Sequence, residues 1–153
     1  MRKRRRDWGV AIGATLLLHY AWEMLQAPLF DVFAGQAFWQ HAWPCFRAAL
    51  GDLLIAGGAS LLTAGLFRRI GWPFVPRWFW PSVVWVILGL IATVAFEVWA
   101  LSVGRWHYTD AMPTIVGIGM APLLQWFVVP AATLAVVRLA VVGAESHKEM
   151  QDG

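Results

Sequence analysis

Charged residues are scarce in this sequence, and their scarcity excludes the commonest class of protein. Only 14% of the residues are Asp, Glu, Lys or Arg, whereas a soluble domain typically carries about 25%. Hydrophobic residues make up 59% of the chain, and the mean hydropathy is +0.59. This composition argues against a soluble enzyme and against a disordered chain, and it indicates a membrane protein.

Cysteine is almost absent as well. The single cysteine, Cys45, excludes an intrachain disulfide and a thiolate-rich metal cluster, so a disulfide-stapled secreted domain is excluded too. No lysine lies in the long apolar stretches of the chain, which excludes a retinal Schiff base. The sequence also contains no G-x-S-x-G, P-loop or dinucleotide-binding fingerprint.

Four nearly continuous apolar stretches are present instead, at residues 8–28, 46–67, 82–103 and 113–137. Each has the roughly 20 residues that a helix needs to cross about 30 Å of hydrocarbon. We therefore predict an all-α, polytopic membrane protein whose four transmembrane helices form one bundle and one domain over residues 1–143. Residues 144–153 are predicted to be a polar C-terminal tail.

The basic residues are distributed unevenly around these stretches. Only Arg47 and Arg105 fall on one side of the predicted bundle. Because Lys and Arg are retained in cytoplasmic loops, both termini are predicted to be cytoplasmic, in a bacterial inner membrane, and segments 29–45 and 104–112 to face outward. The run of basic residues at positions 2–6 therefore indicates the topology and a contact with anionic lipids, and nucleic-acid binding is not predicted. The ten residues of the cytoplasmic side are Arg2, Lys3, Arg4, Arg5, Arg6, Arg68, Arg69, Arg77, Arg138 and Lys148.

A few ionisable side chains lie inside the apolar stretches, where each costs at least about 2.5–3.5 kcal/mol and marks a functional site by default. Three of them are acids that lie about 7–9 Å inside the outer ends of their helices, at 1.5 Å per residue. We predict a polar cavity in the outer half of the bundle, with His19 and Gln125 at its floor and segment 104–113 as its lid. The costly residues are His19, Glu23, Asp52 and Glu97, with the amides Gln26 and Gln125.

Helical spacing places these groups on stripes that face one another. His19, Glu23 and Gln26 are i, i+4 and i+7 on the first helix, so they share one face. Small residues continue the stripes of the other helices and allow close approach. These stripes are Asp52 with Ala56, Ala59, Ser60 and Thr63; Gly89 and Thr93 with Glu97; and Gly117 and Ala121 with Gln125.

This set of side chains favours acid–base catalysis on a lipid-soluble substrate. Carboxyl groups gathered in a low dielectric do not all ionise, so one stays protonated as a general acid while another acts as the base. We predict an integral membrane enzyme of isomerase or cyclase type that acts on a lipid or isoprenoid, with Glu23, Asp52 and Glu97 as the catalytic set and His19 as a proton relay. Substrate contacts are predicted for Trp22, Gln26, Trp99, Trp106, Tyr108, Gln125 and Trp126.

Three alternatives are open at this point. The acids and amides can be interhelical hydrogen-bonding groups, with Arg47 or Arg105 neutralising an acid as a structural ion pair. His19, Glu23, Asp52 and Glu97 can instead ligate iron, manganese or zinc, although no cofactor is predicted. The same acids also suit a small proton- or cation-coupled transporter or a ligand-binding subunit, working as a homo-oligomer.

The pattern of His19-x-x-x-Glu23 on one span, Asp52 on the next and Gln125-Trp126 on the last resembles that of EXPERA-domain proteins. This family includes the emopamil-binding sterol isomerases, four-helix membrane proteins that move a sterol double bond by acid–base chemistry. The resemblance implies the same reaction class here. Two features depart from the family: Glu97 has no counterpart in its pattern, and Leu53, Leu54 and Ile55 replace the acid-x-x-Thr pairing.

Overall fold

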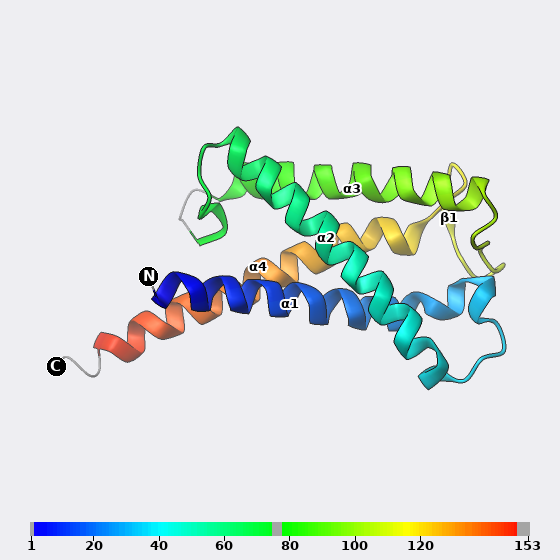
Figure 1. Cartoon of the computed structure of the whole chain (residues 1–153), viewed down its shortest axis with the longest axis horizontal. Coiled ribbons are helices and arrows are strands. Elements are labelled where there is room, and N and C mark those ends of the chain that lie inside the picture. The colour runs from blue at the N-terminus through cyan, green and yellow to red at the C-terminus, as the bar shows by residue number, and fades with distance from the viewer. Residues whose placement is uncertain (1, 75–77, 150–153) are drawn as a thin grey trace.

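Four long helices make up most of the computed structural model. They are α1 (Arg2–Gln26), α2 (Ala42–Leu66), α3 (Phe79–Ser102) and α4 (Met120–Glu149). The structure describes the backbone of residues 2–74 and 78–149 and the side chains of residues 6–74 and 78–140. The helices run alternately up and down (Figure 1), and α1 packs against both α2 and α4. The start of α1 and the end of α4 therefore lie at one end, here the terminal end, and the α1–α2 and α3–α4 connections lie at the other, here the loop end.

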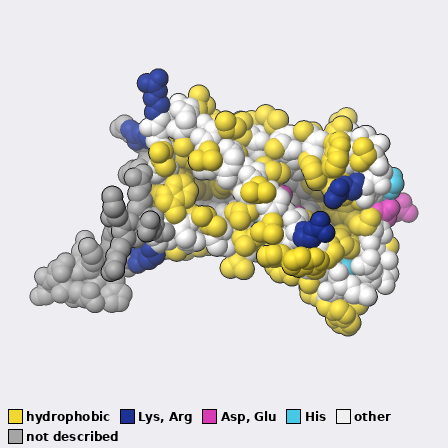
Figure 2. All heavy atoms as spheres, in the orientation of Figure 1, with side chains coloured by type: hydrophobic (Ala, Val, Ile, Leu, Met, Phe, Trp, Pro, Cys, Tyr) yellow, Lys and Arg dark blue, Asp and Glu magenta, His cyan; other side chains and the backbone are white. Residues whose placement is uncertain are grey.

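Three of these helical regions are long and apolar enough to cross a membrane: Phe38–Leu66, Phe79–Ser102 and Met120–Ala140. Large apolar side chains cover the outside of the bundle (Figure 2), and four leucines of α2 are between 65% and 77% exposed. Such a surface indicates a lipid environment. The first helix is not among the three, because His19 and Glu23 interrupt its apolar run. The four leucines are Leu54, Leu61, Leu62 and Leu66.

The fourth helix begins later than the apolar stretch predicts. Residues Thr114–Ile115 (β1) and Ile118–Gly119 (β2) form a short antiparallel hairpin, and α4 starts only at Met120. The two residues between the strands, Val116 and Gly117, have φ angles of 51° and 79°, which is the geometry of a type I′ turn. Gly117 thus lies in a turn and not on the helical stripe that was predicted for it.

The far end of α4 reaches into the segment that was predicted to be a polar tail. The helix continues to Glu149, so it includes the first residues of the predicted tail, and residues 150–153 lie outside the described part of the chain. Several of the basic residues from which the topology was predicted lie outside the described part of the structure. Arg77 lies outside the described backbone, and Arg2, Lys3, Arg4, Arg5 and Lys148 lie outside the described side chains.

Tryptophans fill the core toward the terminal end. Trp85 on α3 is buried and donates a hydrogen bond from Nε1 to the carbonyl oxygen of Ala56 on α2, at 2.9 Å. Trp72, in the connection between these helices, packs edge-on against Trp85. On α4, Trp126 is fully buried, and a Cβ at Gly89 would lie 2.0 Å from its ring. The glycine therefore permits the close approach of α3 and α4, and this rigid core supports the polar groups at the loop end.

Candidate functional site

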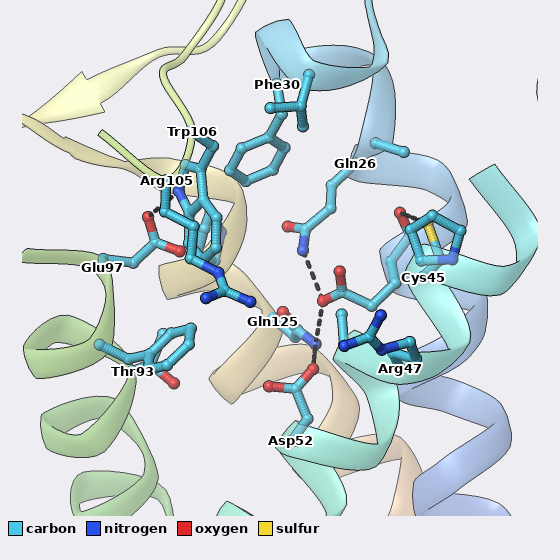
Figure 3. Close-up of a pocket in the computed structure, with 18 of the residues that line it drawn as sticks. Gln26, Phe30, Cys45, Arg47, Asp52, Thr93, Glu97, Arg105, Trp106 and Gln125 are labelled. Atoms are coloured by element: carbon cyan, nitrogen blue, oxygen red, sulfur yellow. Dashed lines mark hydrogen bonds between the residues drawn. The ribbon is translucent and has the colours of Figure 1, made fainter. Parts of the chain in front are cut away.

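A cavity of about 550 Å³ lies at the loop end, between all four helices and both connections. Such a volume lies within the range of small-molecule sites. Figure 3 shows the carboxyl and amide groups converging from the helices, and Figure 2 shows that the hollow opens on the side of the bundle. The acids and amides that line it are Glu23 and Gln26 from α1, Asp52 from α2, Glu97 from α3 and Gln125 from α4.

Gln125 joins two of these acids. Its Nε2 atom lies 2.8 Å from Oδ2 of Asp52 and 3.3 Å from Oε1 of Glu23. The same nitrogen is 2.8 Å from Nδ1 of His19. A primary amide has two N–H donors, so three acceptors on two other helices share them. The structure thus brings His19, Glu23, Asp52 and Gln125 into one hydrogen-bonded cluster, of which Figure 3 labels Asp52 and Gln125.

His19 offers this cluster two proton arrangements. Its ring is 1% exposed, and its Nδ1 lies 3.4 Å from Oδ2 of Asp52 as well as 2.8 Å from the amide of Gln125. When Nδ1 carries a proton it donates to Asp52, and when it carries none it accepts from Gln125. The two arrangements are tautomers of the imidazole and differ in the position of one proton.

Trp22 and Gln26 orient Glu23. The amide of Gln26 donates from Nε2 to Oε1 of Glu23 at 2.7 Å. The indole N–H of Trp22 lies 3.1 Å from Oε1 of Gln26 and 3.2 Å from the carbonyl oxygen of Ala121 on α4. Because Trp22 holds the amide oxygen, the amide nitrogen of Gln26 is turned toward the carboxylate. Trp22 therefore contacts Gln26 and does not line the cavity, whereas a substrate contact was predicted for it.

Glu97 has separate partners on the opposite wall. It is 6% exposed, accepts a hydrogen bond from the hydroxyl of Tyr108, and has Nε1 of Trp106 at 3.4 Å. Burial, and then the hydrogen bond to Glu97, raise the pKa of Tyr108 well above its usual range. The phenol consequently remains a hydrogen-bond donor to Glu97 at neutral pH.

The segment that carries Trp106 and Tyr108 pairs with the segment after α1. Phe30 and Tyr108 form an isolated antiparallel bridge, and the backbone N–H of Thr109 donates to the carbonyl oxygen of Leu29 at 3.0 Å. Asp31 accepts from the backbone N–H of His107 at 2.9 Å, and this hydrogen bond is the main reason why its pKa is lowered. The two connections thus form one cover over the loop end of the cavity, where the sequence predicts a lid.

The aromatic wall differs from the predicted one. Trp106 lines the cavity together with Phe30, Phe33 and Phe96. Of the other predicted aromatic residues, Trp126 is fully buried in the core, with its ring centroid 5.7 Å from that of His19, and Trp99 is 45% exposed. The phenylalanines of the α1–α2 connection were missed because a loop has no periodicity from which a direction can be inferred. Phe96 adjoins Glu97 in sequence, and no spacing rule distinguishes it from a lipid-facing residue.

Two arginines line the same cavity. Arg47 comes from α2 and Arg105 from the connection after α3. The guanidinium of Arg105 lies 5.7 Å from the ring centroid of Trp99. Neither arginine forms an ion pair within 4 Å with a carboxylate of the described residues, so the alternative in which one of them neutralises Asp52 or Glu97 by direct contact is not what the structure contains.

The described residues also include no group of three or more His, Cys, Asp and Glu side chains that is close enough to hold a metal ion. His19 and Asp52 are adjacent, whereas the nearest hydrogen-bond donors to Glu97 are Tyr108 and Trp106. The alternative set of His19, Glu23, Asp52 and Glu97 is therefore not arranged as one set of ligands. No protein family, no curated protein and no solved structure matches the chain.

Proposed function

We propose that the chain is an integral membrane enzyme that moves protons on a lipid or isoprenoid, as an isomerase or a cyclase does. In this proposal α1 is a fourth span, since it is 25 residues long and packs between α2 and α4. Both termini are cytoplasmic in a bacterial inner membrane, as the distribution of basic residues favours. The loop end then faces outward, and the cavity lies in the outer half of the bilayer.

The observation that carries the proposal is the combination of acids and apolar walls in one cavity. Glu23 and Asp52 share the amide of Gln125, and Glu97 faces the same space from α3. The remaining lining is largely aromatic and aliphatic, including Phe30, Phe96 and Trp106. An apolar pocket with a few convergent polar groups is the usual form of a small-molecule site. The resemblance to EXPERA-domain proteins supports the same reaction class.

The proposed chemistry needs two carboxyl groups in opposite protonation states. A protonated carboxyl donates its proton to one carbon of a substrate double bond, and aromatic faces stabilise the cation that forms. A carboxylate then removes a proton from a neighbouring carbon, so the double bond is re-formed in a new position and no net charge is gained or lost. After one turnover the acid has lost a proton and the base has gained one. The cycle closes when that proton passes from the base back to the acid, with His19, which lies 3.4 Å from Asp52, as the relay. The reaction so written balances without an oxidant or a reductant.

The proposal is tested by exchanging each acid for its amide: Glu23→Gln, Asp52→Asn and Glu97→Gln. Cells that produce the wild type or a variant are grown in D₂O, and their lipid extracts are compared by chromatography and mass spectrometry. We expect the wild type to form an isomer that carries deuterium at one carbon, and each variant to form less of it by about 100-fold or more. Asp110→Asn, in an exposed loop position, is the matched control and should resemble the wild type.

Two results would contradict the enzyme assignment. Identical lipid extracts from all strains would contradict it, because the three acids would then have no effect on any lipid. Unchanged lipids together with a proton or cation flux that the amide variants abolish would favour the transporter instead, because intramembrane acids serve both purposes.

A further inference from the structure

Arg47 and Arg105 are exceptions to the charge distribution of the chain, and both line one cavity. The other ten Lys and Arg residues flank the opposite side of the apolar stretches. Arg47 and Arg105 are far apart in sequence, yet they come from α2 and from the connection after α3 to the same space. A basic residue on the outward side opposes the usual topology preference, so its presence there calls for a physical reason.

The two guanidinium groups lie at the rim of the cavity. Both arginines are exposed, and in Figure 3 both side chains reach toward the space between Glu97, Gln125 and Asp52. In Figure 2 the basic side chains of the loop half flank the hollow on the side of the bundle. The rim is therefore positive, whereas the acids lie deeper in the same cavity.

The acids of the cavity have hydrogen-bond donors other than these guanidinium groups. Glu23 accepts hydrogen bonds from the amides of Gln26 and Gln125, and Asp52 accepts one from Gln125. Glu97 accepts hydrogen bonds from Tyr108 and Trp106. No carboxylate of the described residues lies within 4 Å of either arginine. The planar set of N–H donors of a guanidinium fits a phosphate or a carboxylate in a bidentate manner.

We infer that Arg47 and Arg105 bind the anionic head group, a phosphate or a carboxylate, of an amphiphile whose apolar chain lies in the cavity. This inference rests on the proposed function, because it names the substrate class of the same site. The head group stays between the arginines at the rim, and the chain passes Phe30 and Phe96 toward the deeper acids. The negative charge is thereby kept away from Glu23 and Asp52, which face the apolar part of the molecule.

The inference is tested by equilibrium binding to the purified full-length protein in nanodiscs of phosphatidylcholine, with empty nanodiscs as the background. The probes are radiolabelled dodecyl phosphate, dodecanoate, dodecanol and inorganic phosphate. We expect saturable binding of dodecyl phosphate or dodecanoate and at least tenfold weaker binding of dodecanol, since hydrogen bonds to a charged group are lost. Tight binding of inorganic phosphate alone would identify free phosphate as the ligand and would overturn the amphiphile.

Matched variants separate the arginines from general effects of charge. Arg47→Gln and Arg105→Gln should each weaken binding of the anionic probe about tenfold or more, while Arg69→Gln, in the connection between α2 and α3, should leave it unchanged. Arg47→Lys and Arg105→Lys keep the charge and serve if a glutamine variant does not fold; they should bind with intermediate affinity. Equal binding by wild type and all folded arginine variants would refute the inference.

The same samples distinguish this inference from the proposed function. Asp110→Asn, at an exposed position that does not line the cavity, should bind the anionic probe as the wild type does. Selective binding with no lipid modified in cells would leave the head-group site intact and remove the enzyme. Deuterium incorporation that persists in both arginine variants would support the enzyme and contradict the head-group site.

Discussion

The hydroxyl of Tyr108 donates a hydrogen bond to Glu97, a buried acid of α3. This contact fastens the cover over the cavity to one of the acids inside it. A change in the contacts of Glu97 is therefore transmitted directly to the cover, and the first of five predictions begins from this contact.

Tyr108→Phe removes the hydroxyl and leaves Trp106 as the described partner of Glu97. Hydrogen bonds to charged groups contribute about 1.5–3 kcal/mol, so amide exchange in residues 104–112 should accelerate by about tenfold or more. Hydrogen–deuterium exchange with mass spectrometry measures this. Tyr20→Phe is the matched control, because Tyr20 packs its ring against Phe46 on α2. Equal exchange in both variants would show that the contact does not hold the cover.

The raised pKa of Tyr108 also predicts a loss of stability in alkali. The pKa is raised, chiefly by burial, above the ordinary value of 10.0, so the stabilising effect is complete below about pH 10. It is lost as the pH rises above that value, because the unfolded phenol ionises first. The thermal midpoint in detergent should fall between pH 9 and 11.5 more steeply for the wild type than for Tyr108→Phe. Parallel curves would contradict the assignment.

Asp31 should control the pairing of the two connections in acid. The pKa of Asp31 is lowered, first by the backbone N–H of His107, so its contribution is present above the ordinary value of 3.8 and is lost as the pH falls through the lowered pKa. The amide resonance of His107 should shift in that acidic range, and Asp31→Asn should remove the shift. Asp110→Asn, in the same cover, should leave the shift in place.

Gly89→Ala should destabilise the whole bundle. The added Cβ would lie 2.0 Å from ring atoms of Trp126, and overpacking of a filled core typically costs about 1–3 kcal/mol. Gly57→Ala, on α2, is the control, since a Cβ there meets nothing within 4 Å and alanine favours the helix. A thermal shift assay in detergent should show a lower midpoint for Gly89→Ala and an equal or higher one for Gly57→Ala.

Gln125→Leu should affect both stability and the proposed chemistry. It removes the donor that Glu23 and Asp52 share, and loss of a partner by buried acceptors costs about 1–3 kcal/mol. We expect a lower thermal midpoint and loss of the deuterated isomer. Gln36→Leu, at an exposed position, is the control. Full retention of the isomer by a folded Gln125→Leu protein would show that the shared amide has no part in the reaction.

Helical periodicity predicts the burial of polar side chains well, because a helix fixes the direction of each residue relative to its neighbours. Thr15, His19 and Gln26 are buried along one face of α1, and Gly89, Thr93 and Glu97 along one face of α3. The three acids on three helices accordingly face one cavity. These features follow from spacing alone.

Features that depend on turns and on long-range packing could not be predicted in this way. Residues 113–119 are apolar enough to extend the fourth span, and the hairpin depends on the positive φ of Val116 and Gly117. Trp126 shares a helix face with Pro122 and Pro130, but its place in the core depends on the absence of a side chain at Gly89, on another helix. The pairing of Phe30 with Tyr108 joins connections that are distant in sequence.

The cavity opens on the side of the bundle (Figure 2). This position determines whether the affinity of the site for a ligand is expressed as a concentration in water or as a mole fraction in the lipid. If α2 and α3 border the opening within the bilayer, a ligand reaches it by two-dimensional diffusion and never passes through water. The occupancy of the site then depends on the mole fraction of the amphiphile in the surrounding leaflet. Dilution with inert phosphatidylcholine at a constant total amount of ligand should lower occupancy, whereas dilution with buffer should leave it unchanged.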